Sequence, residues 1–422
     1  MKVWFAASCV GALLALSACA SSRVSSPEAA AQLPLEVEER PAEIRVGLLL
    51  PLSGAAAPLG EDMLSATQMA LFDVGENDLV LLPRDTGGTA IGARQAAQEV
   101  IEEGAEVILG PLFSQAVEAV SPVARQADIR VLAFSNAAAA AEEDVFLLGF
   151  RPEEQVVRVV RYALDQGLVE IAGLAPDDPY GRTAMQALRQ AVLERGGRLG
   201  PTLLYPPDQD PSSAVREVAA YDERRAALEA ERARLEQQQD DPQAERELRR
   251  LETLDTLGPP RFNAILLADG GDRLRSVASL LAFFDVDSAT SRFLGTMRWQ
   301  DDPQVLEEPA LRQGWYAAPP PDGIGAFETR FANVFGRPPQ ALAALAYDAT
   351  ALAVIVARDL GDRTFDPVTL SDVEGFAGAS GLFRLRPDGL AEHGLAVLEM
   401  TGSGPRVVDP APASFVGGLA AR

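Results

Sequence analysis

Four small polar residues stand at turns where an apolar run of this sequence gives way to a helical pattern: Ser53, Ser114, Ser135 and Asn136. In a parallel α/β sheet these turns meet at one edge, where unpaired N–H groups and helix dipoles attract an anion. The four residues are therefore candidates to bind the carboxylate of a small ligand. Ser and Asn are also good helix N-caps, worth about 1 kcal/mol each without a ligand. The residues alone leave both interpretations open.

Three further candidates belong to the middle of the chain. Tyr180 opens a predicted helix, and Asp269 and Asp272 follow a predicted strand. A tyrosine at such a turn can cover a ligand, and a carboxylate at a strand end could receive a ligand ammonium group. Asp272 could instead cap the next helix.

The basic side chains nearest to this predicted pocket are Arg84, Arg151 and Arg298. An arginine there would favour planar anionic groups, because its guanidinium presents a flat fork of donors. Trp299 could stack on a ligand, but the sequence favours a buried core position for it.

Missing residue types exclude several kinds of catalysis. Lys2 is the only lysine and His393 the only histidine of the chain. A P-loop lysine, a pyridoxal Schiff base, a Ser–Lys dyad and histidine zinc clusters are therefore excluded from the mature chain. Asp and Glu are numerous enough for a carboxylate hydrolase, yet no other catalytic constellation accompanies them. We expect a protein that is not an enzyme and has no cofactor or metal site.

Length and charge limit the organisation and the partners. A chain of 422 residues with 47% hydrophobic residues is globular and too long for one compact core, which suggests two lobes. The formal net charge of −24 argues against nucleic acid and anionic membrane as partners, because both would be repelled.

The N-terminal segment has the features of an export signal. Residues 1–19 carry one positive charge, a short apolar stretch and small residues before Cys19. Leu16-Ser17-Ala18-Cys19 resembles the bacterial lipoprotein box, which implies a lipidated Cys19 and, with Ala20 following, sorting to the outer membrane. A plain secretory signal with a coincidental cysteine is the alternative. Residues 20–43, rich in Ser, Ala, Pro and Glu, are predicted to be a flexible tether.

Apolar runs without polar alternation recur from Ile44 and predict strands buried on both faces of a parallel sheet. In the first series we expect strands at Ile44–Pro51, Leu79–Arg84, Val107–Pro111, Val131–Ser135 and Val145–Phe150, with helices at Gly60–Asp73, Gly92–Glu103 and Ser114–Ala127. In the second series we expect strands at Glu170–Ala175, Leu199–Tyr205, Ala264–Asp269, Arg292–Gly295 and Trp315–Ala318, with helices at Glu153–Gln166, Tyr180–Arg195 and Asp272–Phe284. A long helix at Gln340–Leu360 and a closing β-hairpin over Gly381–Met400 complete the prediction.

A charged insertion interrupts the second series. Residues 221–257 are crowded with Glu, Arg and Gln, and a break at Asp240-Asp241-Pro242 divides them into halves that each carry a narrow leucine seam. This pattern predicts an antiparallel helical arm. The arm could dock a partner or be a solvated spacer that closes on itself, and the sequence leaves both interpretations open.

Taken together, these residues resemble the type I periplasmic-binding-protein family of the Leu/Ile/Val-binding kind. The motifs that carry the resemblance are Val46–Gly54 (VGLLLPLSG), Gly110-Pro111 with Ser114, Ala133–Ala137 (AFSNA), Asp178-Pro179-Tyr180-Gly181 and Tyr347-Asp348-Ala349. Within the family, the lipoprotein signal, Ala268–Asp272 (ADGGD), Leu294–Trp299 (LGTMRW) and the charged insertion are similar to lipoproteins that activate penicillin-binding proteins.

The resemblance implies two Rossmann-like lobes with parallel sheets, joined by three hinge crossovers near 150–152, 319–321 and 379–381. Lobe 1 would comprise 44–150 and 320–379, lobe 2 would comprise 151–319 and 380–409, and 410–422 would be a tail. It also implies that the matching Tyr180 faces the cleft and covers the ligand.

The function expected from this resemblance is that of an outer-membrane lipoprotein on the periplasmic side. It would regulate peptidoglycan synthesis by binding and activating a penicillin-binding protein. The alternative is a solute receptor that binds a small amino acid, peptide or muropeptide for an ABC transporter. In either case the lipid anchor would be the only contact with a membrane.

Overall fold

The computed structural model describes residues 43–74, 79–238, 241–300, 302–359 and 364–416. The predicted signal peptide, Cys19 and the predicted tether up to residue 42 therefore lie outside the described residues, as do the last residues of the predicted tail. None of the described helices is both long enough and apolar enough to cross a membrane.

The first sheet is wholly parallel and has the strand order β2-β1-β3-β4-β5. Its strands are β1 (Ile44–Leu50), β2 (Leu79–Asp85), β3 (Val107–Leu109), β4 (Arg130–Ala133) and β5 (Val145–Leu147). Successive residues of a strand point to opposite faces, and in β1 both Leu48 and Leu49 are fully buried. The sheet is therefore covered on both sides, as its apolar sequence predicts.

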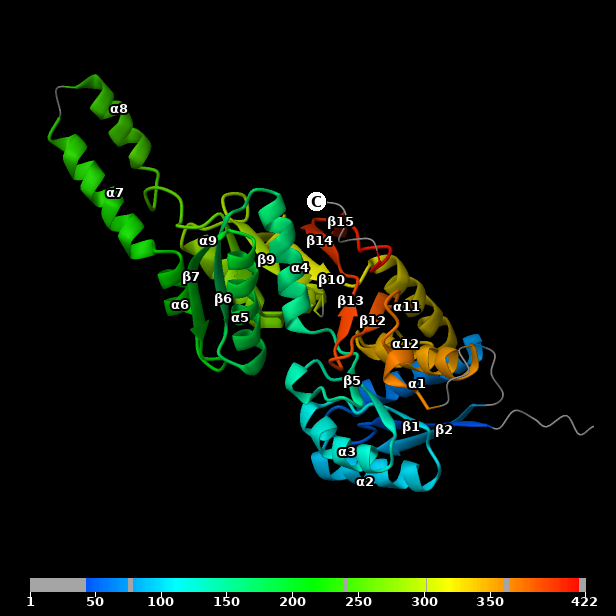
Figure 1. Ribbon diagram of the computed structural model, residues 1–422. Coiled ribbons are helices and arrows are strands. Elements are labelled where there is room, and N and C mark those ends of the chain that lie inside the picture. Colours follow the sequence, from blue (N-terminus) through cyan, green and yellow to red (C-terminus); the bar gives the residue numbers. More distant parts are fainter. Residues whose placement is uncertain (1–42, 75–78, 239–240, 301, 360–363, 417–422) are drawn as a thin grey trace, which may run out of the picture. The chain divides into compact units, whose positions relative to one another are not determined.

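Two pairs of helices cover the first sheet (Figure 1). Helices α1 (Ala57–Val74) and α12 (Ala343–Val354) pack together on the face of Leu48. Helices α2 (Ala90–Glu102) and α3 (Ser114–Gln126) pack together on the face of Leu49. Helix α12 is far from the others in sequence, so the chain returns to this lobe after building the second one.

The second sheet is mixed, with the order β15-β14-β10-β9-β8-β6-β7. Its parallel part contains β6 (Glu170–Pro176), β7 (Arg198–Tyr205), β8 (Ala264–Leu267), β9 (Arg292–Gly295) and β10 (Trp315–Ala318). Strands β14 (Ala396–Thr401) and β15 (Gly404–Asp409) extend it in antiparallel fashion. Helix α4 (Pro152–Asp165) packs with α5 (Pro179–Glu194), and α6 (Ser212–Val218) packs with α9 (Gly271–Phe283). The predicted α/β fold with two sheet-centred lobes is thus confirmed.

Strand β2 differs from the prediction of a strand buried on both faces. It pairs only with β1 at the edge of the sheet, and none of its residues is fully buried. Its run Leu79–Leu82 is as apolar as that of a central strand, so composition alone did not distinguish an edge from a centre.

The predicted closing hairpin over Gly381–Met400 is only partly correct. Strand β12 (Gly381–Leu385) does turn back through Pro387-Asp388-Gly389 to pair with β13 (Ala391–His393). Together with β11 (Phe376–Gly378) these strands form a small third sheet. The chain then leaves this sheet at Gly394, and β14, whose first three residues are apolar and buried, enters the interior of the second sheet beside β10.

The helix expected at Gln340–Leu360 is shorter than predicted. Helix α12 begins at Ala343, and its final turn widens into a π-helix, η4 (Ile355–Asp359). Leu360 lies outside the described residues. Helix α11 (Pro321–Phe335) was not predicted, although Phe327, Phe331 and Phe335 recur at a helical spacing of four residues and stack in sequence.

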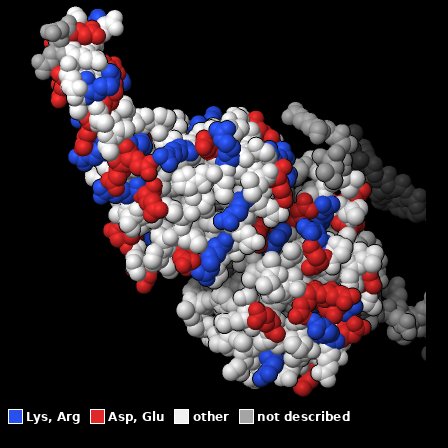
Figure 2. All heavy atoms as spheres, turned by 60° about the vertical axis from the view of Figure 1, so that its left-hand side comes forward, with Lys and Arg blue, Asp and Glu red and all other residues white. Residues whose placement is uncertain are grey.

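The predicted helical arm is confirmed. Helices α7 (Tyr221–Glu236) and α8 (Pro242–Leu251) lie side by side (Figure 1) and bury a leucine seam of their own. The buried members of this seam are Leu228, Leu235, Ala244 and Leu251. On the face shown in Figure 2, acidic and basic side chains intermingle over the arm.

A buried arginine joins the arm to the second lobe. Arg224 donates to the carbonyl oxygens of Gly258 (3.0 Å), Phe284 (3.3 Å) and Asp285 (3.1 Å). At the same level the Leu257 N–H donates to the Arg224 carbonyl at 3.1 Å, so the two ends of the arm meet. The arm therefore leaves and rejoins the lobe at one point.

The remaining short elements lie in the connections. They are α10 (Pro303–Leu306), α13 (Pro367–Leu370), η1 (Ala138–Ala140), η2 (Met297–Trp299) and η3 (Pro309–Leu311). Of these, η2 matters most for the site, because it directly follows β9.

Candidate functional site

A pocket of about 670 Å³ lies where the carboxyl ends of strands from both sheets meet. The turn after β4 contributes Phe134 and Asn136, the turn after β5 contributes Phe150, and those after β6 and β9 contribute Tyr180 and Arg298. Ligands of open α/β sheets bind at this edge, so the predicted location of the site agrees with the geometry.

The pocket wall is mainly apolar and aromatic. Phe134 and Phe150 are almost completely buried, whereas the ring of Phe113 remains 36% exposed. Leu59, Leu112, Leu342 and Leu345 complete the apolar surface on the side of the first lobe. The amides of Asn136, Gln155, Gln300 and Gln340 interrupt it. A few polar groups set in an apolar wall are typical of a small-molecule site.

Two charged side chains line the pocket among the described residues, and they come from different lobes. Arg298 belongs to η2, and its guanidinium carbon lies 3.7 Å from the centroid of the Tyr180 ring. Glu328 belongs to α11 and is largely exposed, and the partial loss of hydration at its carboxyl raises the pKa of that group. Over the ranges that the structure describes, no three His, Cys, Asp or Glu side chains are grouped to hold a metal ion.

Of the seven residues predicted for the site, Asn136 and Tyr180 line the pocket. Ser135 is buried next to Asn136, and its hydroxyl accepts a hydrogen bond from the Ala137 N–H at 3.2 Å. The Ser135 hydroxyl therefore stabilises the turn that contains it. Tyr180 lines the pocket, and its implied role of covering a ligand stays a prediction.

Ser53 and Ser114 do not line the pocket. The Ser53 N–H donates to the Asp85 carboxylate at 3.2 Å, in a loop that precedes α1. Ser114 is the first residue of α3, and Phe113 occupies the N-cap without a side-chain hydrogen bond. The alternative interpretation of Ser114 as a side-chain N-cap is therefore wrong.

Asp269 is engaged inside its own lobe. Its carboxylate accepts hydrogen bonds from the Tyr205 hydroxyl and from Arg273 Nε (3.0 Å) and Nη2 (3.0 Å), and it is 2% exposed. Burial and the negative charge of Asp269 raise the pKa of Tyr205, which therefore stays a hydrogen-bond donor. Asp272 is exposed, pairs with Arg275 at 3.4 Å, and does not cap α9, whose N-cap is Gly270. Neither carboxylate lines the pocket.

The three arginine candidates and Trp299 differ in whether they line the pocket. Arg84 pairs with Glu99 (3.0 Å) and Glu103 beside β2, and Arg151 forms a buried ion pair with Glu154 at 2.6 Å. Trp299 has no exposed surface, so the favoured core interpretation is confirmed. Of the three arginines, only Arg298 lines the pocket.

Gln155 was missed by the sequence reasoning, because its role depends on residues distant in the chain. Its Oε1 accepts a hydrogen bond from the Met297 N–H at 2.9 Å, and its Nε2 donates to the Phe150 and Arg151 carbonyls at 3.2 Å each. Gln155 thereby fixes η2, which carries Arg298, to the crossover that joins the two lobes.

Replacing Gln155 with leucine is expected to reduce the free energy of unfolding by about 2 kcal/mol, because the buried Met297 N–H loses its acceptor. Chemical denaturation measures this change. Gln190→Leu is the matched control, since Gln190 is exposed on α5 and its side chain donates to Glu194. Equal stability of the two variants would contradict the role assigned to Gln155.

Asp85 organises the loop that contains Ser53. Its Oδ1 accepts from the N–H groups of Leu52 (2.9 Å), Ser53 (3.2 Å) and Gly87 (2.7 Å). Burial acts to raise the pKa of Asp85, but hydrogen bonds from the Ser53 side chain and from these N–H groups outweigh it and lower the pKa.

A lowered pKa in the folded state stabilises the protein above the unfolded-state value of about 4, and this contribution is lost as the pH falls through the folded-state value. Asp85→Ala is therefore expected to cost about 1 kcal/mol at pH 7 and progressively less below pH 4. Urea titrations at several pH values test this. Asp208→Ala, in an exposed loop, is the control, and a pH-independent cost for Asp85→Ala would refute the assignment.

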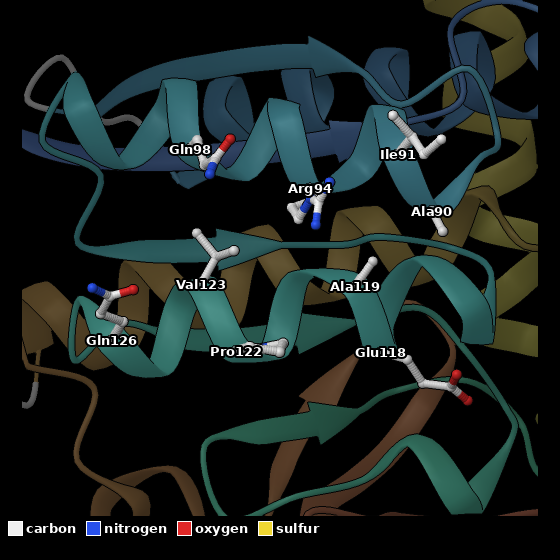
Figure 3. A pocket seen from close by; sticks show the side chains of 9 residues that line it. All are labelled: Ala90, Ile91, Arg94, Gln98, Glu118, Ala119, Pro122, Val123 and Gln126. Atoms are coloured by element: carbon white, nitrogen blue, oxygen red, sulfur yellow. The ribbon is translucent and has the colours of Figure 1, made fainter.

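A second hollow, of about 520 Å³, lies between α2 and α3 (Figure 3). Ile91, Arg94 and Gln98 line it from α2, and Glu118 and Val123 from α3. These residues lie on the outer surfaces of the helices, and Ile91 is 75% exposed. This hollow is a surface groove away from the strand ends.

Two sheet-centred lobes with a pocket at the carboxyl ends of their strands define the class of two-lobed binding proteins. A family model described as "Periplasmic binding protein" matches residues 43–405. The chain therefore belongs to the periplasmic binding protein family, and the resemblance inferred from its motifs is confirmed at this level.

Two curated relatives match the chain over part of its length. The "Uncharacterized protein RP748" of Rickettsia prowazekii is 25% identical over 178 residues, which are 42% of this chain and 47% of that protein. The "Leu/Ile/Val-binding protein homolog 6" of Brucella abortus is 23% identical over 172 residues, 39% of this chain and 44% of that protein. The match thus spans less than half the length of each relative.

Solved structures resemble the chain over most of its length. A branched-chain amino acid ABC transporter ligand-binding protein from Burkholderia xenovorans aligns with a TM-score of 0.68 and 18% identity, covering 89% of this chain and 98% of that one. A solute-binding protein from R. palustris, in complex with benzoate, aligns with a TM-score of 0.59 and 17% identity, covering 88% and 98%. At this identity the likeness establishes the fold alone.

Proposed function

We propose that the protein is a periplasmic solute-binding receptor that encloses a small organic molecule between its two lobes. The observation that carries this proposal is the pocket of about 670 Å³, formed at strand ends by apolar walls with a few amides and one arginine. Structural neighbours support it, because their names describe ABC transporter binding proteins, including complexes with benzoate and isoleucine. The alternative of a solute receptor is thus favoured over activation of a penicillin-binding protein.

Thermal unfolding in the presence of candidate solutes tests the receptor function. The panel contains amino acids, short peptides, muropeptides and aromatic carboxylates. A true ligand at 100 times its Kd should add about 2.7 kcal/mol to the free energy of unfolding. Failure of every compound to raise the Tm would contradict the proposal.

A matched pair of variants places the binding in the pocket. Asn136→Trp puts a large side chain at an exposed position that lines the pocket, whereas Ala139→Trp alters an exposed position close by that does not. The first variant should abolish the thermal shift, and the second should keep it.

A second candidate function is favoured by the arm. A self-contained helical hairpin that carries its own core and projects charged side chains could contact a penicillin-binding protein and activate it in peptidoglycan synthesis. In the variant that tests this, a short Gly-Ser linker replaces residues 226–255. The ends of the arm meet at Arg224 and Leu257, so the lobe should stay folded. Loss of a crosslinked penicillin-binding protein in cells of this variant would support the second function, and its retention would make the arm a spacer.

We also propose that an acylated Cys19 anchors the protein at the periplasmic face of the outer membrane. Cys19→Ala is expected to release the protein from the membrane fraction, and mass spectrometry of the mature N-terminus should detect acyl chains on the natural protein. An unmodified N-terminus in the membrane fraction would refute the anchor.

A further inference from the structure

Arg298 differs from most arginines of this chain in its surroundings. Arg84, Arg151 and Arg273 each pair with a carboxylate, but Arg298 forms no ion pair or hydrogen bond through its side chain with any of the residues described by the structure. Its guanidinium instead lies over the Tyr180 ring at 3.7 Å from the centroid. Stacking occupies the flat face of a guanidinium and leaves the N–H groups at its edge available to a ligand.

The position of Arg298 is set by its neighbours on both sides. The Met297 N–H is held by Gln155 at 2.9 Å, and the indole of Trp299 is buried and donates to the Leu267 carbonyl at 3.2 Å. The cation is therefore presented to the pocket by a braced turn. An arginine held in this way can bind a carboxylate through two parallel hydrogen bonds.

The remainder of the wall fits a flat apolar body. Phe113, Phe134 and Phe150 line the pocket, and the 36% exposure of Phe113 leaves a large aromatic surface for a ligand to cover. Aromatic rings pack favourably against other flat rings, at an offset or edge to face.

The pocket provides little to hold an ammonium group. Asp269, the residue that sequence favoured for this role, is committed to Arg273 and Tyr205, and Asp272 is outside the pocket. Glu328 is the one acidic side chain among the described lining residues. It is exposed to solvent, which screens its attraction for an ammonium group.

From these observations we infer that the pocket binds a planar aromatic carboxylate, with the anion on Arg298 and the ring among Phe113, Phe134 and Phe150, and that the ligand needs no ammonium group. The inference rests on the solute-binding function proposed above and specifies the chemical class of its ligand. It assigns Arg298, and not the four serine and asparagine candidates, as the residue that binds the carboxylate.

Calorimetric titration with three probes tests this class. Benzoate has the ring and the carboxylate, benzamide has the same shape without the charge, and L-phenylalanine adds an ammonium group. We expect the wild-type protein to bind benzoate at least tenfold more tightly than benzamide and at least tenfold more tightly than L-phenylalanine.

Three variants attribute the preference to the guanidinium. Arg298→Met should weaken benzoate binding about 10- to 100-fold while changing benzamide binding little, so that the ratio of the two affinities falls to about one. Arg298→Lys should retain part of the preference, because an ammonium group is a point charge without the fork. Arg195→Met is the matched control at an exposed ion pair just after the end of α5, and it should leave both affinities unchanged.

The outcomes separate this inference from the receptor function. Tighter binding of L-phenylalanine or another amino acid than of benzoate, or an unchanged benzoate-to-benzamide ratio in Arg298→Met, would overturn the ligand class and leave a solute receptor. Absence of binding for every solute in the wider panel would overturn both. A folded Arg298→Met protein, verified by its circular dichroism and Tm, is required for the comparison, and Arg298→Lys supplies the same ratio if that protein does not fold.

Discussion

Replacing Asp348 with alanine is expected to lower the free energy of unfolding by about 3–5 kcal/mol, because several buried donors would lose one acceptor. Asp348 is 2% exposed on α12, and its carboxylate accepts from the N–H groups of Ala379 (2.6 Å) and Ser380 (3.0 Å) and from the Ser380 hydroxyl. These residues form the connection between β11 and β12. The substitution therefore detaches that connection from the helix that covers the first sheet.

Guanidinium denaturation of the purified variant measures this change. Asp322→Ala is the matched control, since Asp322 is exposed at the start of α11. Ser380→Ala, which removes the hydroxyl and keeps both backbone donors paired, should cost only about 1 kcal/mol. A loss below 1 kcal/mol for Asp348→Ala would show that water or a shifted side chain replaces the carboxylate.

Replacing Trp299 with alanine is expected to cost about 4 kcal/mol and to weaken ligand binding as well. The indole has no exposed surface and packs closely against Gly295, where an added Cβ would come within 2.1 Å of the ring. It also packs near the ring of Tyr316, with 5.9 Å between centroids, and its Nε1–H bonds to the Leu267 carbonyl. Removing the ring leaves a cavity directly below η2, the turn that presents Arg298.

Thermal and chemical denaturation measure the free energy of unfolding of the variant, and titration with benzoate measures its affinity for the ligand. Trp299→Phe should recover much of the stability, because a ring still fills the space, but not the bond to Leu267. If Trp299→Ala kept both stability and affinity, the turn would be held by Gln155 alone. A loss of stability without any change in affinity would show that the turn does not depend on the core beneath it.

The strands of both lobes could be predicted because their apolar runs report burial directly. Residues 46–50 and Ala264–Leu267 are covered on both faces, and their apolar residue types require it. The edge position of β2 could not be predicted, since pairing on one side or two depends on the rest of the sheet. The transfer of β14 into the second sheet likewise depends on β10, which lies about 80 residues earlier in the chain.

The site could be predicted by location but not by composition. The strand-to-helix turns indicated Asn136 and Tyr180, and both line the pocket, because topology brings strand ends together. Glu328, by contrast, reaches the pocket only through the returning helix α11, which was not predicted. The sequence indicated Asp269 as a ligand-binding candidate, but its carboxylate is already bound to Tyr205 and Arg273. Whether a polar side chain is available to a ligand depends on its hydrogen-bond and ion-pair partners, and one of these, Tyr205 for Asp269, is distant in sequence.

The independence of the arm has an evolutionary consequence. Its leucines are buried against one another, and it departs and returns at a single point beside Arg224. Selection can therefore lengthen, shorten or recharge this hairpin without disturbing the walls that contact a solute. Homologues of this chain should accordingly diverge quickly in the hairpin while retaining the braced turn around Arg298.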